Sequence, residues 1–319
     1  MLRRYLKGTA IAVTLAVAAT GASAQTFTVG TTEQGSSGYA MTSAMAKVTL
    51  KEAGIRLRAM PQGGPVVTAP LVASGDLDFS IAVSFVAAMG HKGVEMFEPI
   101  GPLEDVVVVA ALRTLPLGVM VPKDSDVQTP ADFKGKTMPS EFNTQRVMKK
   151  LLDAVYEIGG FTSEDIEPYP APTGGRSLED MVAGKVAGTV YTMDSGAAQQ
   201  AQAQIGIRYI DLEPTDENIA IVAKNVPGAL IGEISPGPAF PGVEEPVHVF
   251  VAPFLLLGNK NTDPAAVAAI LEALWGNKDE LVKSYAGFES FDPQKMYADV
   301  GIPYHAAALE FYKSKGLIN

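Results

Sequence analysis

The side chains best suited to hold a small molecule lie in polar loops, and the first of these loops separates a strand pattern from a helix pattern. Residues 31–39 read TTEQGSSGY, between a strand expected over 26–30 and a helix expected over 39–53. A helix that begins there presents free N–H groups and a positive dipole end, which suit a carboxylate or phosphate. Ser and Thr also cap helices, so we expect both roles. The candidate ligand-binding residues are Thr31, Thr32, Ser36, Ser37 and Tyr39.

Further candidates follow strands in the first half of the chain. Ligands of open α/β sheets bind at the carboxyl ends of the strands. Gln62, Gly63 and Gly64 precede a helix expected over 65–74, and paired glycines let a backbone approach a ligand closely. We expect Gln62 and Gly64 to line the floor of the site. Ser84 ends a strand of alternating apolar residues and is a further candidate.

A second set of polar stretches occurs in the other half of the chain. Asn143 or Thr144 is expected to cap a long helix, and Arg146 lies in its first turn. A cation there opposes the helix dipole. Arg146 could be placed there to bind a ligand carboxylate through two hydrogen bonds. An ordinary surface arginine accounts for its position equally well. The candidate residues are Asn143, Thr144, Arg146, Arg176, Tyr191 and Asp194. Donors from two halves of the chain describe a cleft, and its arginines indicate an acid as ligand.

No motif predicts catalysis or a metal site. The sequence has no nucleophile elbow, no phosphate-binding loop, no zinc-protease motif and no cysteine. His91, His248 and His305 lie far apart, and none has a partner at metal-ligand spacing. We therefore expect no enzyme, no catalytic residue, no metal and no cofactor. A hydrolase on a binding-protein scaffold is the enzymatic alternative, and it lacks an evident nucleophile and base.

The N-terminus and the net charge indicate where the protein works. Arg3, Arg4 and Lys7 precede an apolar run, and Ala22-Ser23-Ala24 forms a cleavage site, so residues 1–24 are predicted to be a signal peptide. The net charge is −10, and loss of those three basic residues leaves −13. Such a chain does not suit nucleic acid. We expect a periplasmic protein that is not embedded in the membrane and is a monomer.

Strand and helix patterns alternate along the rest of the chain, and the series starts twice. This alternation predicts an α/β fold of mostly parallel sheets flanked by helices. We expect a type II periplasmic-binding arrangement with lobe 1 at 25–115 and 255–319, lobe 2 at 116–254, and a ligand cleft between them. Expected strands are 26–30, 55–59, 77–83, 106–112, 117–121, 136–138, 186–191 and 247–257, the last crossing between lobes. Expected helices are 39–53, 65–74, 143–156, 177–183, 263–275, 277–285 and 303–315.

These segments together resemble one family. TFTVGTTEQGSSGYAMTSAMAK, QGGPVVTAPLVASGDLDFSIAVS, TPADFKGKTM, NTQRVMKKLLDA, LLLGNKNTD, LWGNKDELVKSY and IPYHAAALEFYKSKGL are similar, in this order, to segments of the TAXI solute receptors of TRAP transporters. The chain departs from the family at residues 141–144, where only Thr144 remains of a Gly/Ser-rich turn, and at Glu33 and Gln34, which interrupt small residues. The resemblance covers essentially the whole chain after residue 24.

The resemblance implies a function and partners. A TAXI receptor captures a small carboxylate or amino acid, similar to glutamate or 2-oxoglutarate, by lobe closure and delivers it to the permease subunits of a TRAP transporter. On this basis Ser36 and Tyr39 would grip one end of the ligand, while Thr144 and Arg146 would hold an anionic group. The alternative is a periplasmic ligand sensor that passes its signal to a membrane histidine kinase.

Overall fold

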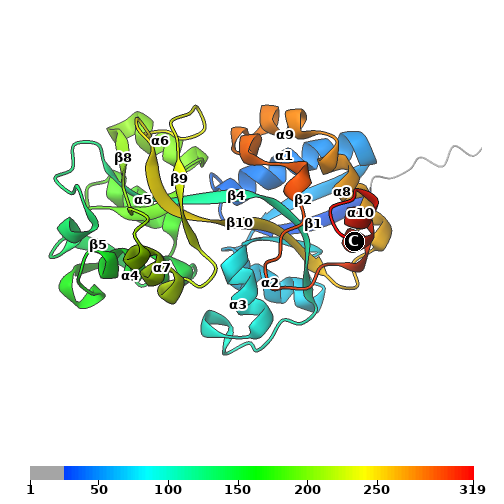
Figure 1. Ribbon diagram of the computed structural model, residues 1–319, viewed down its shortest axis with the longest axis horizontal. Helices are drawn as coiled ribbons and strands as arrows, with labels where there is room; N and C mark the ends of the chain where they lie inside the picture. Colours follow the sequence, from blue (N-terminus) through cyan, green and yellow to red (C-terminus); the bar gives the residue numbers. More distant parts are fainter. Residues whose placement is uncertain (1–24) are drawn as a thin grey trace, which may run out of the picture.

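The computed structural model describes residues 25–319, so the predicted signal peptide lies outside the described residues. Figure 1 shows two lobes, and the strands β4 (Val106–Pro122) and β10 (Val247–Asn259) run through both. Helices and strands alternate in each lobe, which confirms the expected two-lobed α/β class. Within the described part of the chain, no helix is both long enough and apolar enough to cross a membrane.

The sheet of lobe 1 is mostly parallel. The strand β1 (Gln25–Thr31) pairs in parallel with β2 (Ile55–Pro61) on one side and with β3 (Phe79–Val83) on the other. β10 is antiparallel to both β3 and β4, so β4 points the same way as β3. All five residues of β3 are buried, as expected for a strand covered by helices on both faces.

Local signals in the sequence explain where α1 and α2 begin and end. Ser36 caps α1 by accepting a hydrogen bond from the backbone N–H of Tyr39, and Gly54 ends that helix in the left-handed conformation. Pro65 starts α2, and Gly75 ends it. The helices of lobe 1 are α1 (Ser37–Ala53), α2 (Pro65–Ser74), α3 (Ser84–Lys92), α8 (Pro264–Trp275), α9 (Lys278–Ser284) and α10 (Ala306–Ser314).

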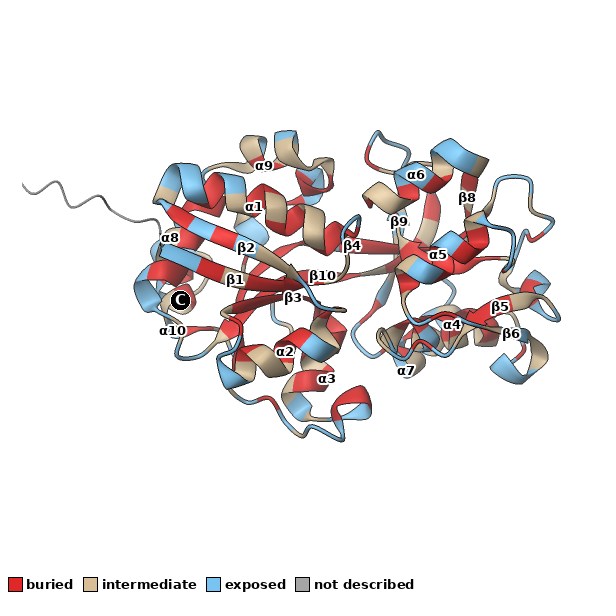
Figure 2. Cartoon of the chain, turned by 180° about the vertical axis from the view of Figure 1, so that it is seen from behind, coloured by how far each residue is buried: buried red, intermediate tan, exposed pale blue. Residues whose placement is uncertain are grey.

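Lobe 2 is built on the far ends of the two long strands. Its strands are β5 (Thr137–Ser140) and β6 (Glu167–Pro170), which pair in parallel, β7 (Thr189–Thr192) and β8 (Ile207–Ile210), which are antiparallel to β4, and β9 (Leu230–Ile234), which is antiparallel to β10. Its helices are α4 (Val147–Ile158), α5 (Gly174–Val182), α6 (Gly196–Ile205) and α7 (Asp216–Asn225). Figure 2 shows the two long strands buried along most of their length, with exposed residues on the outer helices and loops.

The connection between the lobes differs from the expectation in one respect. Two separate strands were expected over 106–112 and 117–121, but β4 is continuous. The intervening residues stay extended because each pairs with β10, from Arg113 opposite Phe254 to Pro116 opposite Val251. The predicted long strand at 247–257 is confirmed as β10. The lobe boundaries at 115/116 and 254/255 fall inside these two strands and stay a prediction.

Candidate functional site

A cavity of about 100 Å³ lies between the two lobes. Lobe 1 contributes the loop before α1, the start of α2, and the adjoining parts of β3 and α3. Lobe 2 contributes the start of α4 and the end of β7, while β4 and β10 pass behind. A cavity lined by elements of both lobes is suited to a small ligand that contacts both at once.

More than half of the residues that line this cavity are apolar. They come from both lobes and from the two long strands, so a ligand that packs against them loses contact with water. Gly63 belongs to this lining and approaches lobe 2 closely, because a Cβ atom placed on it would lie 2.7 Å from Cγ2 of Thr144. The apolar lining residues are Pro65, Val66, Ile81, Val83, Phe85, Val86, Leu115, Leu117, Val147, Met148, Leu151 and Phe254.

The polar lining residues in lobe 1 belong to the cap of α1. Thr32 donates its hydroxyl hydrogen to Oγ of Ser36 at 2.7 Å, and the same oxygen accepts the Tyr39 N–H at 3.2 Å. Ser37 and Gly38 in the first turn also line the cavity. The N-terminal turn of α1 therefore borders the space with the positive end of its dipole.

Glu33 in lobe 1 accepts hydrogen bonds from two residues of lobe 2. Gln145 Nε2 donates to Glu33 Oε2 at 3.1 Å, and the Tyr191 hydroxyl donates to Oε1 at 3.5 Å. Burial raises the pKa of Tyr191, and the Glu33 charge raises it further, so the phenol stays a neutral donor. The half-buried carboxylate thus has neutral partners on both oxygens.

The structure brings only part of the predicted site together. Outside the cavity, Thr31 is buried and donates to the Thr32 carbonyl at 2.8 Å, while Gln62 is exposed. The predicted residues that line the cavity are Thr32, Ser36, Ser37, Gly63, Thr144 and Tyr191. Those that do not line it are Thr31, Tyr39, Gln62, Gly64, Ser84, Asn143, Arg146, Arg176 and Asp194.

Arg146 lies away from the cavity because of the helical repeat of α4. Val147, Met148 and Leu151 share one face of this helix and line the cavity. Arg146 and its helical neighbours Lys149 and Lys150 line a separate surface depression. The helix also begins later than expected, at Val147, and no side chain caps it. The reason is that residues 144 and 145 donate their N–H groups to the Pro172 carbonyl, which holds this segment in a turn.

Arg176 is also held away from the cavity. Its guanidinium binds Asp180 through Nε and Nη2, each at 3.0 Å, one turn along α5. Asp180 is buried, so Arg176 and Lys185 neutralise it on the surface of lobe 2. No Lys, Arg or His lines the cavity in the part of the chain that the structure describes, and the predicted arginine anchor for an anion is not brought there.

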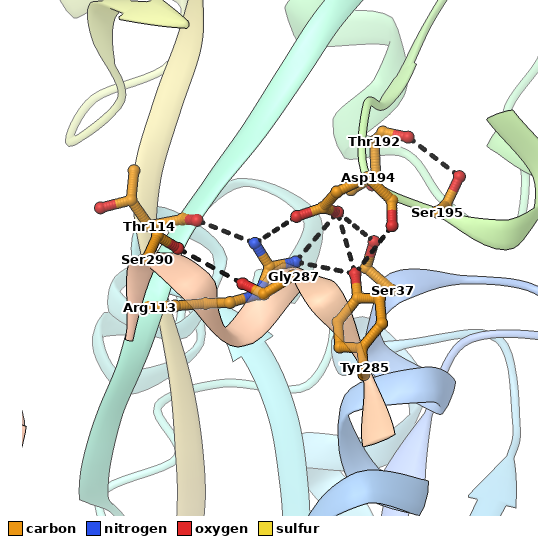
Figure 3. Close-up of polar contacts among 9 residues, drawn as sticks. All are labelled: Ser37, Arg113, Thr114, Thr192, Asp194, Ser195, Tyr285, Gly287 and Ser290. Atoms are coloured by element: carbon orange, nitrogen blue, oxygen red, sulfur yellow. Dashed lines mark hydrogen bonds and ion pairs between the residues drawn. The ribbon is translucent and has the colours of Figure 1, made fainter. Parts of the chain in front are cut away.

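Asp194 forms an ion pair with Arg113 (Figure 3), and the pair is buried, since each side chain is only 1% exposed. Arg113 comes from β4, and its Nη2 lies 3.0 Å from Asp194 Oδ1. Ser37 donates to that oxygen at 2.7 Å, and the Tyr285 hydroxyl lies 3.0 Å from it. Burial by itself lowers the pKa of Arg113, but the Asp194 charge and Tyr285 hold it above its ordinary value. This cluster links lobe 2 to lobe 1.

The sequence signals for the missed residues were weak. Glu33 and Gln145 lie within loops that were singled out, but nothing in their spacing separates them from their neighbours. Arg113 interrupts the apolar run VVVVAALRTLPLGVMV, and a lone arginine in such a run indicates a buried ion pair. Its partner, 81 residues away, follows only from the fold.

The histidines take no part in the cavity. His305 caps α10 by accepting the Ala307 N–H, and His248 lies 3.0 Å from Asp211 on lobe 2. Among residues 25–319, no group of three His, Cys, Asp or Glu residues is placed to hold a metal ion.

Comparison with known proteins places the chain in a family and a fold. Residues 29–316 match the NMT1-like family. MatC from Rhodopseudomonas palustris with bound malate is similar in structure, with a TM-score of 0.59 and 14% identity, covering 92% of this chain and 99% of that one. A periplasmic transporter structure has a TM-score of 0.57 and 17% identity over 92% and 93% of the two chains. The periplasmic binding protein BugD has a TM-score of 0.57 and 11% identity over 92% and 98%. At these identities the likeness is one of fold.

Proposed function

The chain belongs to the NMT1-like family, and from this premise we propose that it is the periplasmic substrate-binding protein of a solute transporter. It captures a small organic acid or amino acid between its lobes. The observation that carries this proposal is the cavity whose lining comes from both lobes. A ligand in it contacts both lobes at once and favours the closed state through its higher affinity for that state.

The transporter that we propose is of the TRAP type, in its TAXI branch. The ordered motifs that resemble the TAXI receptors support this assignment, and the predicted signal peptide supports a periplasmic location. The closed receptor delivers its ligand to the membrane permease subunits. The described surface carries many acidic and basic side chains in exposed pairs, such as Lys123–Glu244 and Lys260–Asp105, which is in keeping with a protein that meets its partner from solution.

Ligand-dependent thermal unfolding tests the receptor function. Residues 25–319 are unfolded and refolded first, to remove any ligand acquired during expression, and then melted with a panel of carboxylates and amino acids. A ligand at 100 times its Kd adds about 2.7 kcal/mol to the free energy of unfolding. For a chain of this size the midpoint then rises by roughly 4 °C. No shift with any compound, together with no small molecule in native mass spectra of the untreated protein, would contradict a receptor function.

The sensor alternative shares the same capture step and differs only in the partner. Co-purification of the ligand-loaded protein with the membrane permease subunits of a TRAP transporter would support transport. Binding to the periplasmic domain of a histidine kinase, with no binding to the permease, would support the sensor instead.

A further inference from the structure

We infer that Glu33 is the group that recognises a ligand ammonium, and that the substrate class is a small amino acid with an apolar side chain. This inference rests on the proposed receptor function and narrows its ligand. It follows from the charge of the cavity, the free acceptor capacity of the Glu33 carboxylate, and the largely apolar character of the remaining lining.

The charge of the cavity opposes a dicarboxylate. Glu33 is the only charged residue among those that line it within residues 25–319, and its charge is negative. Arg146 and Arg176 lie elsewhere, as described above. A second ligand carboxylate would meet either Glu33 or apolar lining residues, and an unpaired charge in apolar surroundings is costly. An ammonium group beside Glu33 has the opposite effect, because it neutralises a half-buried charge.

Glu33 has acceptor capacity left for such a partner. The carboxylate forms no ion pair within the described chain, and its two donors, Gln145 and Tyr191, are neutral. A carboxylate has about four lone-pair sites, so these two hydrogen bonds leave acceptor capacity. Gly175 keeps lobe 2 close to it, since a Cβ atom at that position would lie 2.4 Å from Glu33 Oε1.

The remaining parts of an apolar amino acid match the rest of the lining. Its carboxylate suits the first turn of α1, which borders the space at Ser36, Ser37 and Gly38 and presents backbone N–H donors there. Its side chain suits the apolar lining residues, such as Ile81, Leu117 and Phe254.

Matched ligand pairs test this inference by isothermal titration of the refolded receptor. L-valine is compared with 3-methylbutanoate, and L-leucine with 4-methylpentanoate, which differ only in the amino group. The wild type is expected to bind each amino acid at least about tenfold more tightly than the matched acid, because the ammonium group adds a charge-assisted hydrogen bond to Glu33. In Glu33→Gln, which keeps the size and loses the charge, this preference falls to about twofold or less. Glu244→Gln removes a charge from an exposed surface pair and keeps the preference.

Each other outcome identifies what has failed. If Glu33→Gln weakens the binding of the amino acid and of its acid partner equally, Glu33 only provides a contact between the lobes and the inference is wrong. If the wild type binds the acids as tightly as the amino acids, or prefers L-glutamate, the inference is wrong and the receptor function stands. If no compound binds and native mass spectra show no bound molecule, the receptor function itself fails.

Discussion

At the scale of the residue, Arg113 and Asp194 are the most buried charged side chains in the region between the lobes. Their hydrogen bonds explain how the fold tolerates two buried charges there. Asp194 accepts hydrogen bonds from Arg113, Ser37 and Tyr285, and Arg113 also donates to the Thr114 carbonyl at 3.0 Å (Figure 3). Desolvation of two ions costs several kcal/mol each, and these partners offset it in part, although Arg113 Nε is buried without a hydrogen-bond partner.

Loss of Arg113 is therefore expected to destabilise the fold strongly. Arg113→Met leaves Asp194 charged and buried, and we expect the free energy of unfolding in urea to fall by about 3–5 kcal/mol. The double variant Arg113→Met, Asp194→Leu removes both charges and should recover most of that loss. A double variant as unstable as the single one would show that packing, and not the stranded charge, dominates.

An exposed ion pair provides the control for this measurement. Lys123 and Glu244 are 51% and 72% exposed, and water screens such pairs well. Lys123→Met is expected to leave the urea midpoint unchanged within error. A loss comparable with that of Arg113→Met would mean that the assay reports something other than buried charge.

At Gly118 on β4, the addition of a single Cβ atom is expected to lower the stability of the fold. A Cβ atom there would lie 2.4 Å from Cδ1 of Tyr209 and 2.9 Å from Cγ of Met193. Gly118→Ala is expected to lower the free energy of unfolding by about 1–3 kcal/mol, because the packed ring cannot move away freely. Gly276→Ala is the matched control, since its nearest neighbour would be 3.7 Å away. Equal melting temperatures for the two variants would contradict the packing argument.

At the scale of the element, the cap of α1 is expected to serve both the helix and the ligand. Ser36 and Thr215 cap α1 and α7 in the same way, each accepting a backbone N–H three residues ahead. Ser36→Ala and Thr215→Ala should each cost about 1 kcal/mol of stability. Only Ser36 lines the cavity, so only Ser36→Ala should weaken binding of the best ligand, measured by titration calorimetry. Equal affinities for the two variants would contradict a role of this cap in binding.

The cap of α10 is expected to make stability depend on pH. His305 Nδ1 accepts the Ala307 N–H at 3.2 Å, and Nε2 lies 3.1 Å from the Thr262 carbonyl. Burial lowers the pKa of His305 below its ordinary 6.5, and the Thr262 contact raises it in part. The unfolded state therefore binds the proton first as the pH falls, and stability that is complete above pH 6.5 is lost as the pH drops through the folded-state pKa.

The Asn variant checks this pH dependence. Asn caps helices and does not titrate, so His305→Asn should flatten the loss of melting temperature from about pH 6.5 downward to pH 5. Carboxylates contribute to acid unfolding in both proteins and cancel in the comparison. Parallel curves for the wild type and the variant would contradict the role of His305.

The elements also show what local sequence can predict. α2 begins and ends as expected, because Pro65 and Gly75 act within one turn. α3, α6 and α7 were not predicted, and their burial explains why. Most of α3 is buried around its whole circumference, while α6 buries only Ala198 and Ala201 and α7 only Val222. None of them has the apolar stripe on which the helical repeat is recognised.

The candidate site was less predictable than the fold, because it depends on which loops meet. Of the residues predicted around the α1 cap, Thr32, Ser36 and Ser37 line the cavity and Thr31 and Tyr39 do not, and their contact with a ligand stays a prediction. Arg146 was chosen because it lies near a helix start, but that criterion does not say which face of the helix borders the cavity. Neighbouring residues on a helix differ in direction by about 100°, and Arg146 lies with Lys149 and Lys150 on a different face from Val147, Met148 and Leu151.

At the scale of the whole molecule, direct contacts between the lobes set how easily the receptor opens. The Tyr285 hydroxyl in lobe 1 lies 3.0 Å from both the backbone oxygen and Oδ1 of Asp194 in lobe 2. Tyr312 offers a matched hydroxyl that stays within lobe 1, donating to the Val109 carbonyl at 2.7 Å. Variants of the two tyrosines therefore distinguish an effect on lobe closure from an effect on the stability of the fold.

Tyr285→Phe is expected to shift the ligand-free protein toward open forms, whereas Tyr312→Phe is expected to lower stability alone. The reason is that affinity falls with the fraction of molecules able to close. With about 1 kcal/mol lost per hydrogen bond, the Kd of Tyr285→Phe should rise about fivefold. Small-angle scattering should show a larger radius of gyration for its ligand-free form and the wild-type value once ligand is saturating. A rise in Kd of the same size for Tyr312→Phe would mean that lost stability, and not opening, weakens binding.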